Sequence, residues 1–209
     1  MTSERPRQTP SQTVGPFFGY ALPFPGGAQL VPAGTPGAVT VHGRVLDGAG
    51  EAIPDALLEW WQPDAEGALS RRDGSRVREL GHFTGFGRMT VDLDGHYELT
   101  TVLPGAVAPS TVPWALVTVF ARGLLHHLFT RAYLVGADDA VPADPLLDRI
   151  DAGRRETLLA RADGPASYRF DIHLQGDRET VFLEYAAVEH AALDRATRDH
   201  AAFGQAERP

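Results

Sequence analysis

The sequence has 209 residues and a formal net charge of −8, with 43% hydrophobic and 22% charged residues. A chain of this length can fold as one domain and bury roughly two-thirds to three-quarters of its unfolded surface. The negative charge argues against nucleic acid or an anionic membrane as a partner. The chain contains no cysteine and no lysine, which excludes disulfides, thiolate metal sites and Schiff-base chemistry.

The chain divides into three parts by composition. Residues 1–37 are rich in Pro and Gly and predict an extended N-terminal arm, residues 38–185 form the core, and residues 186–209 predict a C-terminal tail or surface helix. No apolar run approaches the roughly 20 residues that a membrane helix needs, and the N-terminus lacks the apolar segment of a secretory signal. We therefore expect a cytoplasmic protein.

The core consists of short runs of alternating apolar and polar residues separated by turns. Turn signals rich in Asp and Gly occur at residues 47–50 and 92–95, and the second predicts a hairpin. This spacing of strand and turn, about every 10 residues, predicts an all-β fold of the sandwich type. The expected strands are residues 39–45, 57–61, 89–91, 97–101, 114–120, 124–134, 168–174 and 180–185.

The strand at residues 114–120 is largely apolar on both faces. We expect it in the middle of the sandwich, with neighbours on both sides and a layer over each face. The adjacent Trp60 and Trp61 predict that at least one large side chain lies in the core. Residues 145–150 and 154–162 space their apolar residues by three and four, which predicts two short helices.

Three stretches of the chain resemble the intradiol ring-cleavage dioxygenase family. They read T-P-S-Q-T-V-G-P-F from Thr9, P-W-A-L-V-T-V-F-A-R-G from Pro113, and Y-R-F-D-I from Tyr168. The resemblance extends from about Thr9 to Tyr185. It implies an intradiol-dioxygenase-like β-sandwich with the N-terminal arm laid over its surface.

In that family two Tyr and two His side chains hold a ferric ion. The matching positions in this sequence are Leu69, Val107, Trp114 and Leu116. Leucine and valine cannot ligate a metal, and tryptophan offers only an N–H donor. We therefore expect neither a bound metal nor a catalytic residue in this chain. The adjacent His126 and His127 give no replacement site, since neighbouring residues of a strand point to opposite faces.

The resemblance implies that the chain is like the alpha-type, non-iron-binding subunits of this family. A homologous beta subunit would then hold the Fe(III), and the hetero-oligomer would cleave protocatechuate with O2 in aromatic catabolism. The arm and the end of the central strand would complete the substrate pocket. The matching positions are Thr13, Gly15, Pro16 and Arg122.

Glycine lets the backbone approach a ligand closely, and a Thr hydroxyl can bond a carboxylate. An arginine at the position of Arg122 could also form an ordinary salt bridge at the end of the strand, and Arg131 is expected to be structural. Two alternatives stay open for the whole chain. One is a self-sufficient intradiol enzyme for another catechol, and the other is a non-catalytic, transthyretin-like β-sandwich that binds a partner or small molecule.

Overall fold

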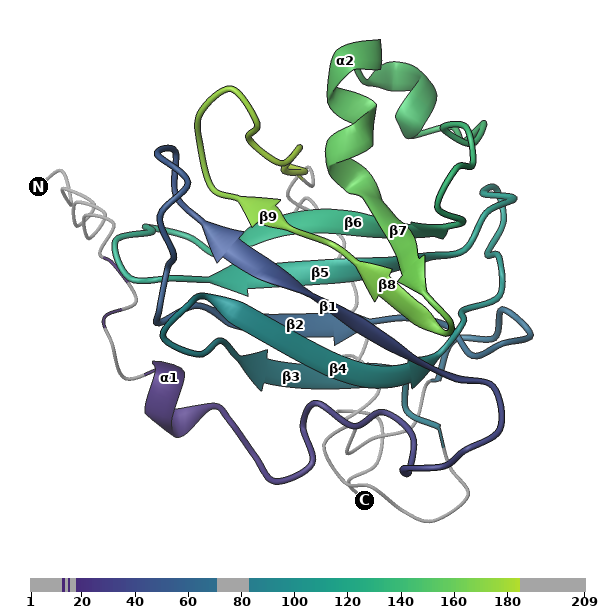
Figure 1. Ribbon diagram of the computed structural model, residues 1–209, viewed down its shortest axis with the longest axis horizontal. Coiled ribbons are helices and arrows are strands. Elements are labelled where there is room, and N and C mark those ends of the chain that lie inside the picture. Colours follow the sequence, from purple (N-terminus) through teal and green to yellow (C-terminus); the bar gives the residue numbers. More distant parts are fainter. Residues whose placement is uncertain (1–12, 14, 16–17, 71–82, 185–209) are drawn as a thin grey trace, which may run out of the picture.

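The structure is a computed structural model that describes residues 13, 15, 18–70 and 83–184 (Figure 1). Its nine strands form one sheet in the order β3-β2-β5-β6-β7-β8-β1-β4, with β9 paired to β1. The strands are β1 (Ala38–Leu46), β2 (Leu57–Trp61), β3 (Phe86–Thr90), β4 (His96–Val102), β5 (Trp114–Phe120), β6 (Leu128–Val135), β7 (Leu159–Gly164), β8 (Ser167–Arg169) and β9 (Ile172–His173).

The sheet curls into a nearly closed sandwich around one main core. The core takes side chains from β1 and β4 on one side and from β2 and β5 on the other, including Val41, Leu99, Leu58 and Val117. This architecture confirms the all-β sandwich predicted from the strand and turn spacing. The division into arm, core and tail stays a prediction, and residues 186–209 lie outside the described part.

The strand predicted to have sheet neighbours on both sides does have them. β5 pairs antiparallel with β2 on one side and with β6 on the other. Its two faces differ, however. Ala115, Val117 and Val119 are almost completely buried in the core, whereas Trp114 and Leu116 on the other face are only half-buried. The expected full layer over this second face is therefore absent from the described residues.

The two tryptophans of β2 separate in the same way. Trp60 is 1% exposed and belongs to the core, while Trp61 is 39% exposed and contacts the Phe86 ring at an interplanar angle of 47°. Adjacent residues of a strand point to opposite faces, so only one of the pair can reach the core. The prediction that at least one of them is a core residue is confirmed.

The prediction of a hairpin at residues 92–95 is wrong, because the strands on either side of this turn do not pair with each other. The turn forms, with the Asp92 carboxylate accepting hydrogen bonds from the backbone N–H groups of Asp94 and His96. It joins opposite layers, however, because β3 pairs with β2 and β4 pairs with β1. β3 also begins three residues earlier than expected, since its ladder with β2 continues through Gly87 to Phe86.

The second predicted helix ends too early to reach residue 162. Short helices occupy Leu147–Arg149 (η1), Ala152–Arg155 (α2) and Glu156–Leu158 (η2), and residues from Leu159 onward form β7. β7 pairs in parallel with β6, where Leu159 lies opposite Tyr133. Buried backbone N–H and C=O groups need hydrogen-bond partners, and pairing with β6 supplies them. This outweighs the weak helix preference that the apolar spacing of residues 159–162 indicates.

The end of the core also differs from the expectation. The strand predicted at residues 168–174 is divided into β8 and β9, and the segment predicted at 180–185 forms only an isolated bridge between Leu183 and Phe129. The N-terminal arm contributes the short helix α1 (Phe18–Ala21). No helix among the described residues is long and apolar enough to span a membrane.

Candidate functional site

The four positions that the resemblance matches to iron ligands lie on one side of β5 and in two neighbouring loops. Trp114 and Leu116 are two residues apart on the half-buried face of β5. Val107 follows β4 and lines a pocket with Trp114. Leu69 is 58% exposed and follows a turn whose Gly67 packs against the backbone of Ala106.

The pocket beside Trp114 has a volume of about 310 Å³, and we call it the β5 pocket. The structure brings Val107 and Trp114 together in it, but neither Leu69 nor Leu116 lines it. Its other walls come from the loop after β4, from β6, and from the segment before η1. The full lining is Val107, Ala108, Pro109, Ser110, Trp114, Arg131, Asp144, Pro145, Leu146 and Arg149.

Arg131 dominates the electrostatics of the β5 pocket. β6 places Arg131 opposite Leu116 in the ladder with β5, and its guanidinium lies 3.8 Å from the centroid of the Trp114 ring. This is the geometry of a cation–π contact. Arg131 Nη1 also donates to the Tyr133 hydroxyl at 3.3 Å, and that hydroxyl donates to Asp144 Oδ1 at 2.8 Å.

The protonation states in this network follow from burial and hydrogen bonding. Burial, more than any other cause, raises the pKa of Tyr133 well above its usual range, so the hydroxyl keeps its proton. Burial also acts to raise the pKa of Asp144. Hydrogen bonds from Ser110, Tyr133 and the backbone of Leu146 and Leu147 outweigh that effect and lower the pKa below its usual range. Asp144 is therefore a carboxylate at neutral pH.

The residues at the four matching positions do not fit a ferric ion. Three are aliphatic, and the fourth offers an indole N–H, which donates a hydrogen bond and cannot ligate. In the part of the chain that the structure describes, no group of three or more His, Cys, Asp or Glu side chains could hold a metal ion. We therefore assign no metal-dependent step to the residues that the structure describes.

The residues predicted to bind substrate lie on or near the N-terminal arm. Thr13 is exposed, and Gly15 has a φ of +72°, a left-handed conformation that favours glycine. Pro16 lies outside the described residues. The arm then forms α1, where Gly19 and Tyr20 line a pocket of about 320 Å³ together with Arg122.

Arg122 forms the strand-end ion pair that was the alternative to substrate binding. Its Nε lies 2.7 Å from Asp55 Oδ2, although the angle does not make this contact a hydrogen bond. The Arg122 side chain is still 66% exposed, so most of its surface remains accessible from the pocket that Gly19 and Tyr20 line. The structure thus brings Arg122 beside the arm.

Arg88 holds the arm against the sheet. Its Nη1 donates to the backbone carbonyl of Leu22 at 2.7 Å, and its Nε donates to Glu59 Oε1 at 2.9 Å. The guanidinium also lies 5.9 Å and 5.4 Å from the ring centroids of Phe24 and Phe86. The residues of α1 are therefore fixed relative to β3 by a mostly buried charge pair.

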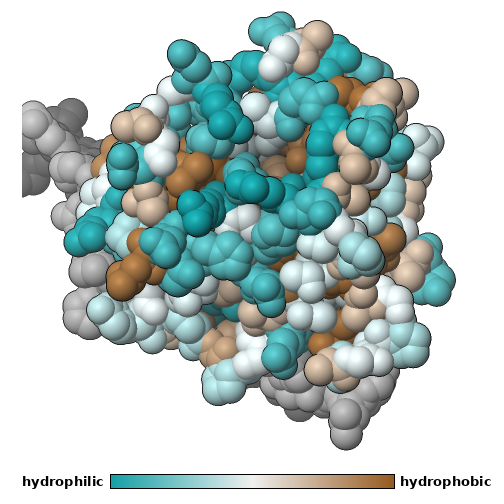
Figure 2. All heavy atoms as spheres, in the orientation of Figure 1, coloured by the Kyte–Doolittle hydropathy of each residue, from teal (hydrophilic) through white to brown (hydrophobic). Residues whose placement is uncertain are grey.

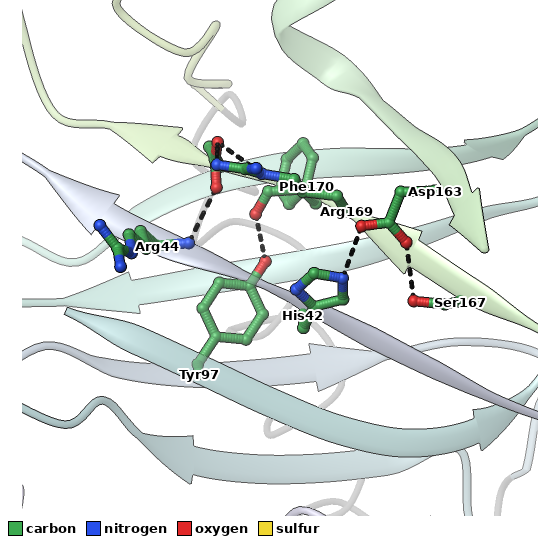
Figure 3. Close-up of polar contacts among 8 residues, drawn as sticks. His42, Arg44, Tyr97, Asp163, Ser167, Arg169 and Phe170 are labelled. Carbon is green, nitrogen blue, oxygen red and sulfur yellow. Dashed lines mark hydrogen bonds and ion pairs between the residues drawn. The ribbon is translucent and has the colours of Figure 1, made fainter. Parts of the chain in front are cut away.

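A second polar cluster links β1, β7 and β8, as Figure 3 shows. His42 Nε2 lies 2.9 Å from Asp163 Oδ2, and the Ser167 hydroxyl donates to Asp163 Oδ1 at 2.7 Å. Chiefly the Ser167 bond, and then His42, lowers the pKa of Asp163. The Ser167 hydroxyl donates to Asp163 and not to His42. The cluster therefore does not pair a nucleophile with a general base. It joins three strands on a mostly hydrophilic face (Figure 2).

Arg131, Asp144 and Arg149 were not predicted from the sequence to line a pocket. Arg131 was assigned a structural role, and neither Asp144 nor Arg149 was singled out. The available signal was an arginine within an otherwise apolar strand, at a position that alternation places on the same face as Tyr133. The sequence does not indicate which residue lies across from Arg131, because this depends on the register of β5 with β6.

The fold is a β-sandwich of the dioxygenase class. The chain matches the family model described as Dioxygenase over residues 15–176. It is 41% identical over 196 residues to the Protocatechuate 3,4-dioxygenase alpha chain of Burkholderia cepacia, which covers 85% of this chain and 98% of that one. The chain therefore belongs to the intradiol dioxygenase family, as its three resembling stretches predicted.

Two further relatives place the chain within this family. It is 30% identical over 152 residues to the Protocatechuate 3,4-dioxygenase beta chain of Burkholderia cepacia, covering 66% of this chain and 64% of that one. The solved dioxygenase domain of a dioxygenase and carbohydrate-binding protein fusion from Streptomyces sp. SirexAA-E superposes with a TM-score of 0.50 at 28% identity. It covers 81% of this chain and 99% of that one. Members of the family normally use Fe(III).

Proposed function

We propose that this chain is the non-iron-binding alpha subunit of a protocatechuate 3,4-dioxygenase. The observation that carries the proposal is the likeness to an alpha chain over nearly the whole length of both proteins, combined with four residues that cannot ligate iron. A homologous beta subunit would hold the Fe(III) through two Tyr and two His. The complex, which we expect in the cytoplasm, would cleave protocatechuate with O2 between its hydroxyls to 3-carboxy-cis,cis-muconate.

The role of this chain in the proposed complex is to complete the substrate pocket. Gly15 exposes backbone in a left-handed conformation, and Thr13 offers an exposed hydroxyl. Pro16 continues the same stretch. Arg122, with two-thirds of its side chain exposed, can donate a charge-assisted hydrogen bond to a carboxylate. Arg88 supports this role indirectly, because it fixes the segment that follows these residues.

Expression of the chain alone and together with its homologous beta subunit tests the proposal. The lone chain is expected to be colourless and inactive. The co-expressed complex is expected to show the wine-red colour of a ferric tyrosinate and to consume O2 with protocatechuate. Tightly bound iron with turnover in the lone chain would instead support the self-sufficient enzyme. Failure of the two chains to form a complex would support the non-catalytic binding module.

The contribution of Arg122 is tested in the active complex with Arg122→Gln. Loss of a charge-assisted bond to the substrate carboxylate is expected to lower kcat/KM for protocatechuate by roughly tenfold or more. The value for catechol, which lacks the carboxylate, should change little. Arg44→Gln is the matched control, since this exposed arginine lies on β1. Equal losses for both substrates would assign Arg122 to structure alone.

A further inference from the structure

A charge pair is enclosed between the sheet and the part of the arm that follows α1. Glu59 of β2 and Arg88 of β3 lie opposite each other in the ladder between these strands. Their side chains are only 17% and 11% exposed. The arm lies over them, because the Phe24 ring stacks on the Phe86 ring of β3 with centroids 6.2 Å apart.

Arg88 binds two points of the arm and its charge partner at the same time. Its Nη1 donates to the Leu22 carbonyl directly after α1, and its backbone N–H donates to the Gly27 carbonyl at 2.9 Å. Its Nε and Nη2 both donate to Glu59 Oε1. The donors of a guanidinium have a fixed planar arrangement, so the position of Glu59 in the sheet determines the position of Leu22. We call Arg88 and Glu59 the arm clamp.

Stability alone does not account for a clamp made of charges. Removing two charges from water is costly, and replacing a buried ion pair by apolar side chains of similar volume is often neutral or stabilising. Phe24 and Phe86 show that apolar contacts can also hold the arm on this surface. A hydrogen-bonded charge pair adds direction, because such bonds form only within a narrow range of distances and angles. The arm clamp therefore determines where the arm lies.

The arm clamp lies close along the chain to the residues proposed to line the substrate pocket. Only two residues separate Gly15 from Phe18, the first residue of α1, which is 4% exposed. α1 is a single turn, and the Leu22 N–H donates to the Phe18 carbonyl at 3.2 Å. A shift of Leu22 therefore moves α1 and, with it, Thr13 and Gly15.

The other end of the arm is attached to the sheet without the clamp. Leu30 is 4% exposed and belongs to the main core. Its N–H donates to the Thr100 carbonyl of β4, and the Thr100 N–H donates to the Ala28 carbonyl, both at 2.8 Å. Loss of the clamp should therefore release α1 from β3 while the sandwich stays folded.

We propose that Arg88 is a positioning residue for substrate binding, an inference that rests on the function proposed above. Arg88 contacts no substrate. It holds the arm where Thr13 and Gly15 can line the pocket, and Glu59 orients its guanidinium. When only a fraction of the molecules has the binding conformation, the apparent affinity falls by that fraction. Loss of the clamp therefore weakens substrate binding and leaves the chemical step on the beta subunit unchanged.

Steady-state kinetics of the complex carrying Arg88→Gln test the proposal. Glutamine is too short to reach Leu22 and Glu59 together, so KM for protocatechuate is expected to rise roughly tenfold. The kcat at saturating substrate should change less than about twofold, because bound substrate selects the positioned arm. Glu59→Gln keeps the shape and an acceptor oxygen but removes the charge, and it should raise KM by a smaller factor. It also decides the question if Arg88→Gln does not assemble.

Arg161→Gln in the same complex is the matched control. Arg161 also binds a carboxylate and the backbone, since it donates to Glu156 Oε2 at 2.7 Å and to the Asp139 carbonyl at 2.9 Å. It lies in β7, far from α1 (Figure 1). This variant should leave KM unchanged. An equal rise in KM for Arg161→Gln would show that Arg88 acts only through general stability, which would overturn the proposal.

Hydrogen–deuterium exchange of the same complexes gives a readout that does not depend on turnover. The amides of residues 18–27 should exchange faster in Arg88→Gln, whereas those of β4 should not change. Faster exchange with an unchanged KM would show that the position of the arm does not affect substrate binding. Unchanged exchange would show that the clamp does not fix the arm. Either result overturns this inference alone, whereas an inactive wild-type complex would also refute the proposed function.

Discussion

At the scale of single residues, buried polar side chains hold the sandwich together where its layers meet. Gln62 directly follows β2 and is 3% exposed. Its Oε1 accepts hydrogen bonds from Trp60 Nε1 and the Thr101 hydroxyl, both at 2.8 Å, and its Nε2 donates to the Val102 carbonyl at 2.9 Å. One amide thus satisfies groups from β2 and β4, which lie on opposite sides of the core.

Replacement of this amide should be strongly destabilising. Gln62→Leu keeps the size of the side chain but leaves the Trp60 N–H, the Thr101 hydroxyl and the Val102 carbonyl buried without partners. We expect a loss of about 2–4 kcal/mol in the free energy of unfolding, measured by urea denaturation. The same change at the exposed Gln175 should cost much less. Equal effects at the two positions would contradict the role of this network.

A second residue makes stability depend on pH. Burial, followed by the charge of Arg178, lowers the pKa of His173 below its usual value of 6.5. The unfolded chain therefore takes up a proton before the folded chain does. The resulting stabilisation is fully present above about pH 6.5 and is lost as the pH falls toward the lowered pKa of the folded state.

His173→Gln removes this titration. Between about pH 7.5 and pH 5.5, the wild-type chain should therefore lose more unfolding free energy than the variant. Urea denaturation at a series of pH values measures the difference. Parallel pH profiles for the two proteins would show that His173 has the same pKa in both states.

At the scale of elements, close backbone crossings determine which strands can pair. Gly43 lies in β1 opposite Tyr97 of β4. A Cβ at this position would meet the carbonyl oxygen of Phe170 at 2.0 Å, and that same oxygen accepts a hydrogen bond from the Tyr97 hydroxyl. The glycine therefore lets the break between β8 and β9 lie directly against β1.

Gly43→Ala should separate these segments and lower the free energy of unfolding by more than about 2 kcal/mol, as overpacking of a rigid contact does. Thermal denaturation measures the loss. Gly153→Ala provides the control, because this helical glycine has open space around its Cβ position and should tolerate or gain from the change. An unchanged midpoint for Gly43→Ala would mean that the crossing can relax.

At the scale of the whole molecule, the half-buried face of β5 and the arm are the features that the proposed partner would use. A subunit that binds only the folded chain stabilises it by mass action. Excess beta subunit is therefore expected to raise the unfolding midpoint of this chain, with a gain of about 2.7 kcal/mol at 100 times the dissociation constant. Differential scanning calorimetry at increasing beta concentration measures this. A midpoint independent of concentration would contradict a stable complex.

The sequence by itself determined the strands with clear alternation and the chemical groups that each position can offer. The segments at residues 57–61 and 114–120 match β2 and β5 because period-two patterns record which side chains must be buried. Residue identity alone shows that the side chains of Leu69, Val107, Trp114 and Leu116 cannot serve as metal ligands in any fold.

Only the tertiary structure decided which distant residues meet. The register of β5 with β6 brings Arg131 onto Trp114, and the approach of the loop before η1 adds Asp144 to the same pocket. The parallel pairing of β7 with β6 likewise turned a segment with helical spacing into a strand. Local patterns carry no information on such contacts, because their energies depend on side chains and backbone that are remote in the sequence and come together only in the folded chain.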